Sequence, residues 1–444
     1  MTDMPRARTW IRSTLYLGAL VSALTRPALA SATPAEPAAP AEANVPAEAN
    51  ARTGASDEAR VEIHLITIGP GDHIYTAGGH AAVMAAWIHD GEADPSRTLI
   101  YNFGDTDFED PELPSKLLRG GAQFRLTVLG TLQDLVDDYG LRQGRDVWRQ
   151  KINLSDAQAA QVADSLAHTA LPENRDYPHH YHYSTCTTKI RDVLDEATDG
   201  ALREALLGVP ASPSTSRGME RILFRRHHLM ALVSSLFFGR VHDRPVDKWF
   251  ATVATKSLSD YLQEIQVPAP DGRGTVPLAE PPTPLIQYIE PDVVKIPSIT
   301  TPLVTILAML LLGFGGRRAL HRLPGKTAGA GLWIGSYGLI SGLLGLLMLA
   351  VMLYSDLDEL RHNENALIFP VTDLLLVYLG VLWSRRPLRT GERKLLNTYA
   401  LARMALLLLV VLLQLLGVLY QEPRIFIAMS GLFSVGLLAL ARRA

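Results

Sequence analysis

The stretch YHYSTCTTKIRD, from Tyr181 to Asp192, contains Cys186, the only cysteine of the sequence. A chain with one cysteine forms no internal disulfide and no thiolate-rich metal site. Ser184 and Thr185 precede it, and both are residue types that cap the N-termini of helices. Apolar residues then follow at helical spacing, at Ile190, Val193, Leu194 and Ala197. The pattern predicts a helix with Cys186 in its first turn, where the helix dipole favours a thiolate.

A lone cysteine is a buried small hydrophobe, a partner for another chain or a nucleophile, and the compartment bears on which of these applies. Arg6, Arg8 and Arg12 precede the apolar stretch LYLGALVSAL, and small residues follow at Ala28–Ala30. This pattern predicts a secretory signal peptide over residues 1–30. Residues 31–56 are mostly Ala, Pro and Glu, which predicts a disordered linker. We therefore expect the folded part to lie outside the cytoplasm.

Four segments carry the composition and the turn punctuation of short strands. They are RVEIHLITIG (Arg60–Gly69), HAAVMAAWI (His80–Ile88), RTLIYNFG (Arg97–Gly104) and AQFRLTVLG (Ala122–Gly130). Residues 131–140 and 155–171 predict helices, the second with a capping box formed by Ser155 and Gln158. Together with the helix after Cys186, these segments predict a folded domain with mixed α and β structure over residues 57–290.

A thiolate nucleophile benefits from a base that accepts its proton and orients it. His80, in GDHIYTAGGHAAV, follows a glycine pair and opens a predicted strand, so its imidazole is accessible; the alternative is an ordinary strand-edge histidine. His179, His180 and His182 form a second group of histidines. No acidic or cysteine ligand lies at helical spacing beside them, so we expect no metal and no cofactor.

After residue 300 the sequence becomes strongly apolar. Five runs predict membrane spans: Pro302–Gly316, Leu332–Tyr354, Ala366–Trp383, Tyr399–Tyr420 and Ile425–Leu440. Basic residues gather after the first run, after the third and at the end of the chain (Arg317, Arg318, Arg322, Lys326, Arg385, Arg386, Arg389, Arg393, Lys394, Arg442, Arg443). The other loops carry only Arg361 and Arg424. The positive-inside rule therefore places residues 60–300 and the loop 355–365 on the same, non-cytoplasmic side of a transmembrane domain over residues 300–444. The net charge of −3 gives no reason to expect a nucleic-acid partner.

Several motifs follow one another between residues 61 and about 262: GDHIYTAGGHAAV, YNFGDTDF, INLSDAQ, ENRDYPHHYHYSTCTTKIRD and GRVHDRPVDKWF. Their order resembles that of the Lnb family of lipoprotein N-acyltransferases. The resemblance implies an α+β periplasmic domain with a permuted papain-like fold, similar to lecithin:retinol acyltransferase, followed by an all-α transmembrane bundle of about five helices. It also implies a multi-pass protein of the bacterial inner membrane, a phospholipid acyl donor and a lipoprotein acceptor.

Residue by residue, the resemblance makes Cys186 the nucleophile and His80 its base. Other matching positions imply supporting roles, with a purely structural role as the alternative: Tyr101, Asn102, Gly104, Asn174, Arg175, Arg191 and Asp192. The family is expected to have asparagine before the nucleophile, where this chain has Thr185, so the oxyanion donor is in question. Asp72 and His182 are the candidates for a third member of the catalytic group.

The loop SDLDELRHNEN carries His362, Asn363 and Asn365, which resemble a polar motif of the family's membrane region; the alternative is an ordinary solvated loop. Three classes of function remain. The first is acyl transfer from phospholipid, through a thioester on Cys186, to the N-terminal amine of a lipoprotein. The second is a periplasmic cysteine peptidase or amidase, and the third is a non-catalytic envelope protein. The pairing of His80 with Cys186 argues against the third class, and attachment to the membrane favours the first.

Overall fold

The computed structural model describes residues 60–224, 227–270, 272–288, 326–422 and 424–442. The predicted signal peptide, the linker and the apolar run Pro302–Gly316 lie outside the described residues.

The predicted strands form the centre of one antiparallel sheet. They are β1 (Arg60–Ile68), β2 (His80–His89), β4 (Leu99–Asp105) and β5 (Gln123–Leu129). The sheet has the order β12-β6-β1-β2-β4-β5-β7, and β3 (Glu92–Ala93) pairs with β2. The sequence analysis missed β6 (Val147–Lys151), β7 (Asp176–Pro178) and β12 (Thr283–Ile286), which are short and lack the apolar alternation of the central strands. The prediction of a mixed α and β domain is confirmed.

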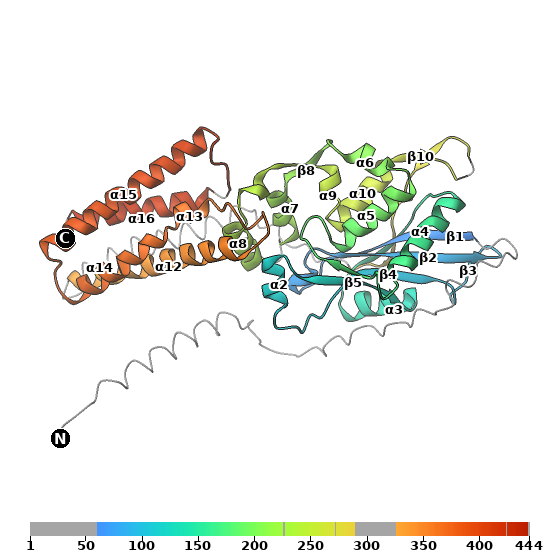
Figure 1. Cartoon of the computed structure of the whole chain (residues 1–444), viewed down its shortest axis with the longest axis horizontal. Coiled ribbons are helices and arrows are strands. Elements are labelled where there is room, and N and C mark those ends of the chain that lie inside the picture. The colour runs from blue at the N-terminus through green and yellow to red at the C-terminus, as the bar shows by residue number, and fades with distance from the viewer. Residues whose placement is uncertain (1–59, 225–226, 271, 289–325, 423, 443–444) are drawn as a thin grey trace, which may run out of the picture. The chain divides into compact units, whose positions relative to one another are not determined.

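Both faces of the sheet are covered. Val61, Ile63 and Leu65 of β1 point into a core shared with α4 (Asp156–Thr169), α5 (Cys186–Ala197) and α10 (Thr255–Glu264). Ile66 and Ile68 pack on the other face, against α3 (Leu132–Leu135) and η2 (Val136–Arg142). Figure 1 shows α4, α5 and α10 on one side of the strands and α3 on the other. Since burying one such aliphatic side chain contributes about 1.5–3 kcal/mol, this two-sided burial explains why β1 reads as a nearly continuous apolar run.

The predicted helix starts are confirmed by their caps. The Ser155 side chain and Gln158 form the predicted capping box at the start of α4. Thr185 caps α5, the helix that begins with Cys186. The predicted helix over 131–140 is α3, continued by the π-helical turn η2.

Short elements complete this part of the chain: η1 (Ile74–Thr76), α2 (Leu113–Arg119), α6 (Ala201–Leu206), β8 (Pro210–Thr215), α7 (Ser216–Leu223), α8 (His228–Phe237), η3 (Arg240–Asp243), β9 (Pro245–Asp247), α9 (Lys248–Ala251), β10 (Gln266–Pro268) and β11 (Thr275–Pro277). Arg217 of α7 is 1% exposed and donates two hydrogen bonds to Asp243 of η3, at 2.7 and 3.0 Å. This ion pair joins α7 to η3.

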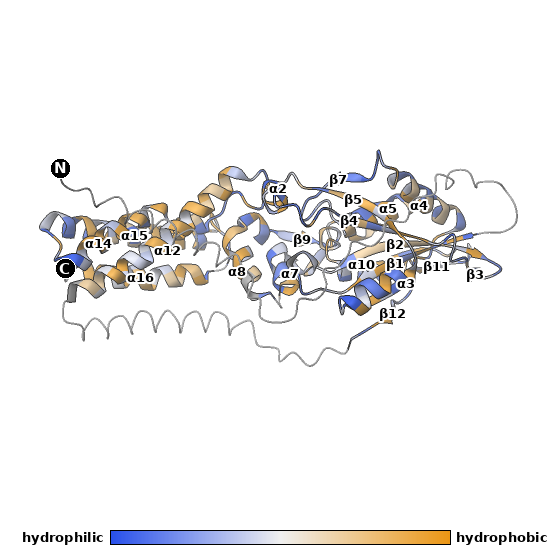
Figure 2. Cartoon of the chain, turned by 90° about the horizontal axis from the view of Figure 1, so that it is seen from below, coloured by the Kyte–Doolittle hydropathy of each residue, from blue (hydrophilic) through white to orange (hydrophobic). Residues whose placement is uncertain are grey.

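The C-terminal helices are α12 (Lys326–Tyr354), α13 (Asn365–Ile368), η4 (Val371–Asp373), α14 (Leu374–Arg385), α15 (Thr390–Leu415) and α16 (Ile425–Ala441). Figure 2 shows how apolar α12, α14, α15 and α16 are along their length. Three segments of the described residues are long and apolar enough to cross a membrane: 328–354, 365–385 and 390–415. The helix Ile425–Ala441 is shorter. The span predicted as Tyr399–Tyr420 lies in α15, which begins at Thr390 and ends at Leu415. The first turns of this helix are polar, so the apolar pattern alone does not mark its start.

A buried ion pair joins these helices. Arg403 of α15 donates to both carboxylate oxygens of Asp373 at 2.6 Å, and the two side chains are 2% and 0% exposed. Tyr337 of α12 and Ser430 of α16 each take a further hydrogen bond from Arg403, at 2.7 Å. Removing one partner of such a pair costs about 3–5 kcal/mol, because the remaining charge is left buried. The network therefore fixes how α12, α15 and α16 pack around η4.

Candidate functional site

Cys186 is the first residue of α5 and lies where the sequence predicts it. The Thr185 Oγ1 accepts the Thr188 backbone N–H at 3.3 Å, which satisfies one of the free donors of the first turn. Ile190 and Leu194 on the inner face of α5 are 0% and 1% exposed, and they anchor the helix in the core under the sheet. Cys186 itself is partly buried, so its position is fixed by a capped and anchored helix.

His80 and Asn102 face each other from neighbouring strands. The register that pairs Val83 of β2 with Tyr101 of β4 brings Asn102 close to the start of β2, where His80 lies. The His80 Nε2 is 2.5 Å from the Asn102 Oδ1, and Asn102 is 5% exposed. With Nε2 held by the amide oxygen, Nδ1 is the ring nitrogen that remains for Cys186. Cysteine, histidine and asparagine therefore form one connected group.

Gly104 lies between the histidine and the cysteine. Its φ of +102° is a conformation that side-chain-bearing residues rarely adopt. A Cβ at this position would lie 3.5 Å from the His80 Cε1 and 3.6 Å from the Cys186 Cβ. Glycine is thus favoured here by the backbone conformation, and its position next to both side chains shows that His80 and Cys186 border the same point of β4.

The surroundings of Cys186 favour its thiolate. Burial by itself raises the pKa of the thiol, but the charge of His80 and its hydrogen bond to the sulfur outweigh this effect. A contact with the Thr187 hydroxyl and the Ala81 backbone N–H act in the same direction, and the pKa falls from 9.0 to about 7. A thiol with this pKa is substantially ionised at neutral pH, which is the form that acts as a nucleophile.

This pKa predicts the pH dependence of any reaction that starts from the Cys186 thiolate. Above the pKa the reactive form predominates, so kcat/KM should rise with pH, with a midpoint at about 7, and level off by about pH 8.5. An ordinary thiol would give a midpoint about two pH units higher. The rate of alkylation by iodoacetamide, measured on the folded protein against pH, checks this without a substrate. A midpoint near 9 would contradict the description of the site.

The sequence analysis missed two residues behind His80. The Tyr139 ring stacks on the His80 ring with 5.7 Å between centroids, and the Arg145 guanidinium lies 5.2 Å from the Tyr139 centroid. Arg145 is 2% exposed and donates through Nε to the Gly69 carbonyl at 2.8 Å. Burial lowers the pKa of Arg145, while Tyr139 and Cys186 raise it. No sequence motif marks Tyr139 or Arg145 as a site residue. Both reach the site only through the folding of η2 and of the loop that follows it.

A buried hydroxyl lies on the other side of Gly104. The Tyr177 hydroxyl of β7 would lie 4.0 Å from a Cβ on Gly104, and among the described residues no partner meets hydrogen-bond geometry with it. Burial, and after it the charge of Cys186, raises the pKa of Tyr177 well above its usual range, so this hydroxyl keeps its proton. Thr185, which stands where asparagine is expected, uses its hydroxyl oxygen in the helix cap. Tyr177 is therefore a neutral donor beside Cys186.

The other residues that were predicted to support catalysis make contacts that stabilise the fold. Arg191 donates to Asp192 at 2.6 Å and lies 3.8 Å over the Trp249 ring, so the pair anchors α5 to α9. Tyr101 is a core residue, 3% exposed. Asn174 is exposed and donates to the His168 carbonyl at 3.0 Å, and the Arg175 carbonyl accepts the Leu126 N–H.

The two sequence candidates for the third catalytic position are not the residues that the structure brings to His80. Asp72 is an exposed loop residue. The His182 Nδ1 is 3.2 Å from the Glu359 Oε1, and its ring lies 5.0 Å from that of His242. The side chain that holds the Nε2 of His80 is instead that of Asn102, in the sequence motif YNFG.

The loop 355–365 is an anchored segment. Asn363 donates to the Leu236 and Phe237 carbonyls at 2.7 and 3.1 Å, and Asn365 donates to the Ser235 and Leu236 carbonyls. Both asparagines are buried, at 4% and 2% exposed. They satisfy the free carbonyls at the end of α8, which is a structural use of their amides. His362, with a φ of +53°, borders a cavity together with His180 and Glu359.

These features define a class of protein. Its members are membrane proteins in which a domain of mixed α and β structure places a cysteine beside a histidine. Residues 47–218 match the family model of the Lnb N-terminal periplasmic domain, which supports an Lnb-family protein. No curated protein and no solved structure matches the chain.

Proposed function

We propose that this protein is a membrane-bound acyltransferase that uses Cys186 to move an acyl chain from a phospholipid to the N-terminal amine of a lipoprotein. The observation that carries the proposal is the connected group of Cys186, His80 and Asn102, in which the thiol has a lowered pKa. Along the chain, the strand that carries His80 comes before the helix that carries Cys186. This is the order of a permuted papain-like fold, which we propose for the domain. We place the domain in the periplasm of a bacterium, attached to a multi-pass region in the inner membrane.

The first half-reaction loads the enzyme. The Cys186 thiolate attacks the ester carbonyl carbon of the phospholipid, and the new C–S bond replaces the C–O bond to glycerol. The leaving alkoxide takes the proton that the His80 imidazolium carries, so a lysophospholipid and an acyl thioester result. The Asn102 amide holds the imidazole in orientation through both proton transfers.

The second half-reaction unloads the enzyme. The amine of the acceptor attacks the thioester carbonyl, His80 accepts the proton that the nitrogen loses, and Cys186 leaves as the thiolate. Each step passes through a tetrahedral oxyanion. The Tyr177 hydroxyl and the free N–H groups of the first turn of α5 are the donors for this oxyanion, in place of the asparagine expected at position 185.

The membrane part supports lipid substrates. The Glu359 backbone carbonyl accepts the Gly239 N–H at 2.7 Å, and the Ser355 hydroxyl donates to the Leu118 carbonyl at 2.6 Å. The loop between two apolar helices thus contacts the domain that carries Cys186. Both substrates of the proposed reaction are held in a bilayer by acyl chains, so a catalytic domain attached at the membrane surface meets them there.

The alternative function is a periplasmic cysteine peptidase or amidase, which the same catalytic group also allows. A non-catalytic envelope protein is the weakest of the three candidates, because it has no need of an oriented imidazole beside an ionised thiol.

The proposed function is tested on a reporter lipoprotein in cells that lack every other N-acylating enzyme. With this protein present, the mass of the reporter's N-terminal peptide should increase by one acyl chain on the amine. The matched control is the same chain with Cys186→Ala. An unchanged N-terminus together with cleavage of the reporter would favour the peptidase or amidase.

A further inference from the structure

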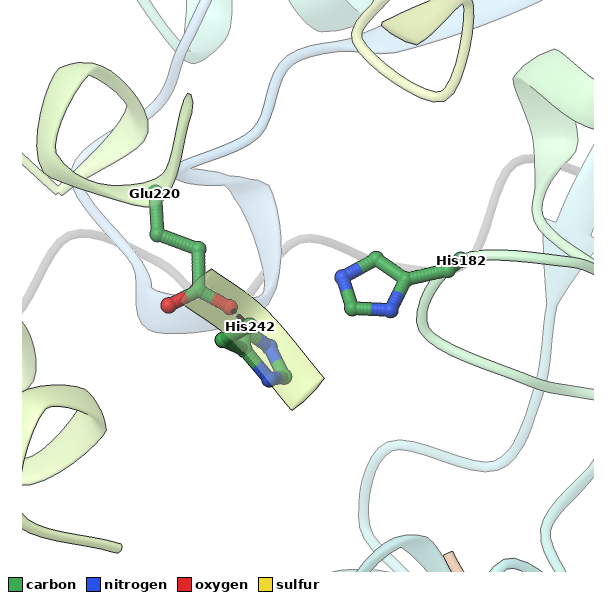
Figure 3. Close-up of side chains that lie close together, drawn as sticks. All are labelled: His182, Glu220 and His242. Atoms are coloured by element: carbon green, nitrogen blue, oxygen red, sulfur yellow. Dashed lines mark ion pairs between the residues drawn. The ribbon is translucent and has the colours of Figure 1, made fainter. Parts of the chain in front are cut away.

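Three side chains with metal-binding atoms meet beside the segment that leads into α5. His182 lies in the turn before this helix, Glu220 in α7 and His242 in η3. One ligand atom from each lies within 4.8 Å of the others. The side chains of His182, Glu220 and His242 are 10%, 10% and 0% exposed. Figure 3 shows His182 facing Glu220 and His242 from the opposite side.

The hydrogen bonding of His242 is incomplete. Its Nε2 lies 2.8 Å from the Glu220 Oε1, yet neither ring nitrogen makes a hydrogen bond of acceptable geometry with the described residues. The Phe238 ring stacks on His242 at 4.3 Å and 7°, which fixes the plane of the imidazole. A buried imidazole that is held in place but unpaired is unusual in a native protein. A bound cation would satisfy the nitrogen and the carboxylate oxygen together.

The remaining atoms of the cluster are already oriented as in known metal sites. The His182 Nδ1 is 3.2 Å from the Glu359 Oε1, which leaves Nε2 for a metal. Metal-binding histidines commonly use their second nitrogen in this way, on a carboxylate. The Glu220 Oε2 accepts a hydrogen bond from Ser234 at 3.2 Å, which leaves Oε1 on the side of His242.

We propose that His182, Glu220 and His242 bind a divalent transition metal, zinc being the ion that fits two imidazoles and one carboxylate best. Three protein ligands of these types leave a fourth position for water or for an oxygen of a ligand. A cavity of about 270 Å³ borders two of the three ligands, His182 and His242, which line it together with Glu359. Metal–ligand bonds of about 2.0–2.2 Å require the three groups to approach one another by roughly an ångström when the ion binds.

The sequence analysis predicted no metal because His179, His180 and His182 have no acidic neighbour at helical spacing. The fold supplies the acidic ligand and the second histidine from α7 and η3. His182 lies four positions before Cys186 (186 − 182). A metal here would therefore join the turn before α5 to α7 and η3, and through Glu359 to the membrane loop. The site does not depend on the reaction proposed at Cys186.

The experiment uses the full chain, purified in detergent with an affinity tag that contains no histidine. After addition of zinc sulfate and removal of the excess, elemental analysis should give about one zinc per wild-type chain. Glu220→Gln and His242→Gln should each reduce this at least tenfold. The matched control is His64→Gln, because His64 is also buried beside a glutamate, 3.6 Å from Glu62, but belongs to no cluster of three metal-binding side chains within the described residues. This variant should keep the wild-type zinc content.

Thermal unfolding gives a second readout. Zinc should raise the unfolding temperature of the wild type and of His64→Gln, but not that of Glu220→Gln, which keeps the shape of the side chain. Three results would overturn the proposal: no zinc after removal of the excess, equal zinc in wild type and both cluster variants, or bound zinc without a change in unfolding temperature. The last result means an adventitious ion only.

Discussion

Replacing Cys186 by serine should reduce acyl transfer by at least about a thousandfold. The hydroxyl of serine is far less acidic than a thiol, so the interactions that lower the pKa of Cys186 to about 7 produce almost no alkoxide at neutral pH. The measurement is the rate of N-acylation of a purified lipoprotein in phospholipid vesicles.

The serine variant keeps the fold, because the oxygen takes the place of a sulfur at the capped start of α5. The control is therefore its unfolding temperature and its yield in the membrane, both of which should equal the wild type. If the serine variant transfers acyl chains at more than about a tenth of the wild-type rate, the thiol serves packing and the proposed chemistry is wrong.

Replacing His80 by alanine should reduce the rate about 10²- to 10⁴-fold, the range typical for loss of a general base. The variant loses the proton acceptor and the positive charge that stabilises the thiolate, so its alkylation midpoint should also move up from about 7. Combining His80→Ala with Cys186→Ser should add little to the loss, because base and nucleophile act as one unit.

His89→Ala is the matched control for His80→Ala. His89 is the last residue of the strand that His80 opens, and its side chain is 66% exposed beside Asp90. Its loss should change neither the rate nor the alkylation midpoint. An unchanged midpoint in His80→Ala would show that the histidine does not act on Cys186.

The sequence predicted those parts of the fold that local patterns determine. The apolar strands around His80 and Asn102 and the capped helices at Ser155 and Thr185 appear as expected, because alternation and capping act over a few residues. Short strands such as β12 were missed, since its pairing partner β6 lies far away in the sequence.

The same distinction applies to the candidate site. The sequence motifs predict that His80 acts on Cys186, whereas the contact of His80 with Asn102 depends on the register between β2 and β4. Tyr139 and Arg145 have no recognisable pattern, and only tertiary packing places them behind the imidazole. The polar loop of the membrane part was expected to orient a substrate or to be solvated, but its two asparagines are buried against α8.

The central claim is that Cys186 carries the acyl chain between donor and acceptor. The most direct test is the intact mass of the purified protein after incubation with phospholipid whose acyl chains are isotopically labelled, with no acceptor present. The account predicts a mass increase of one acyl chain on Cys186, which disappears on addition of hydroxylamine or of an acceptor lipopeptide. An unchanged mass, or a label that persists in Cys186→Ala, would contradict it.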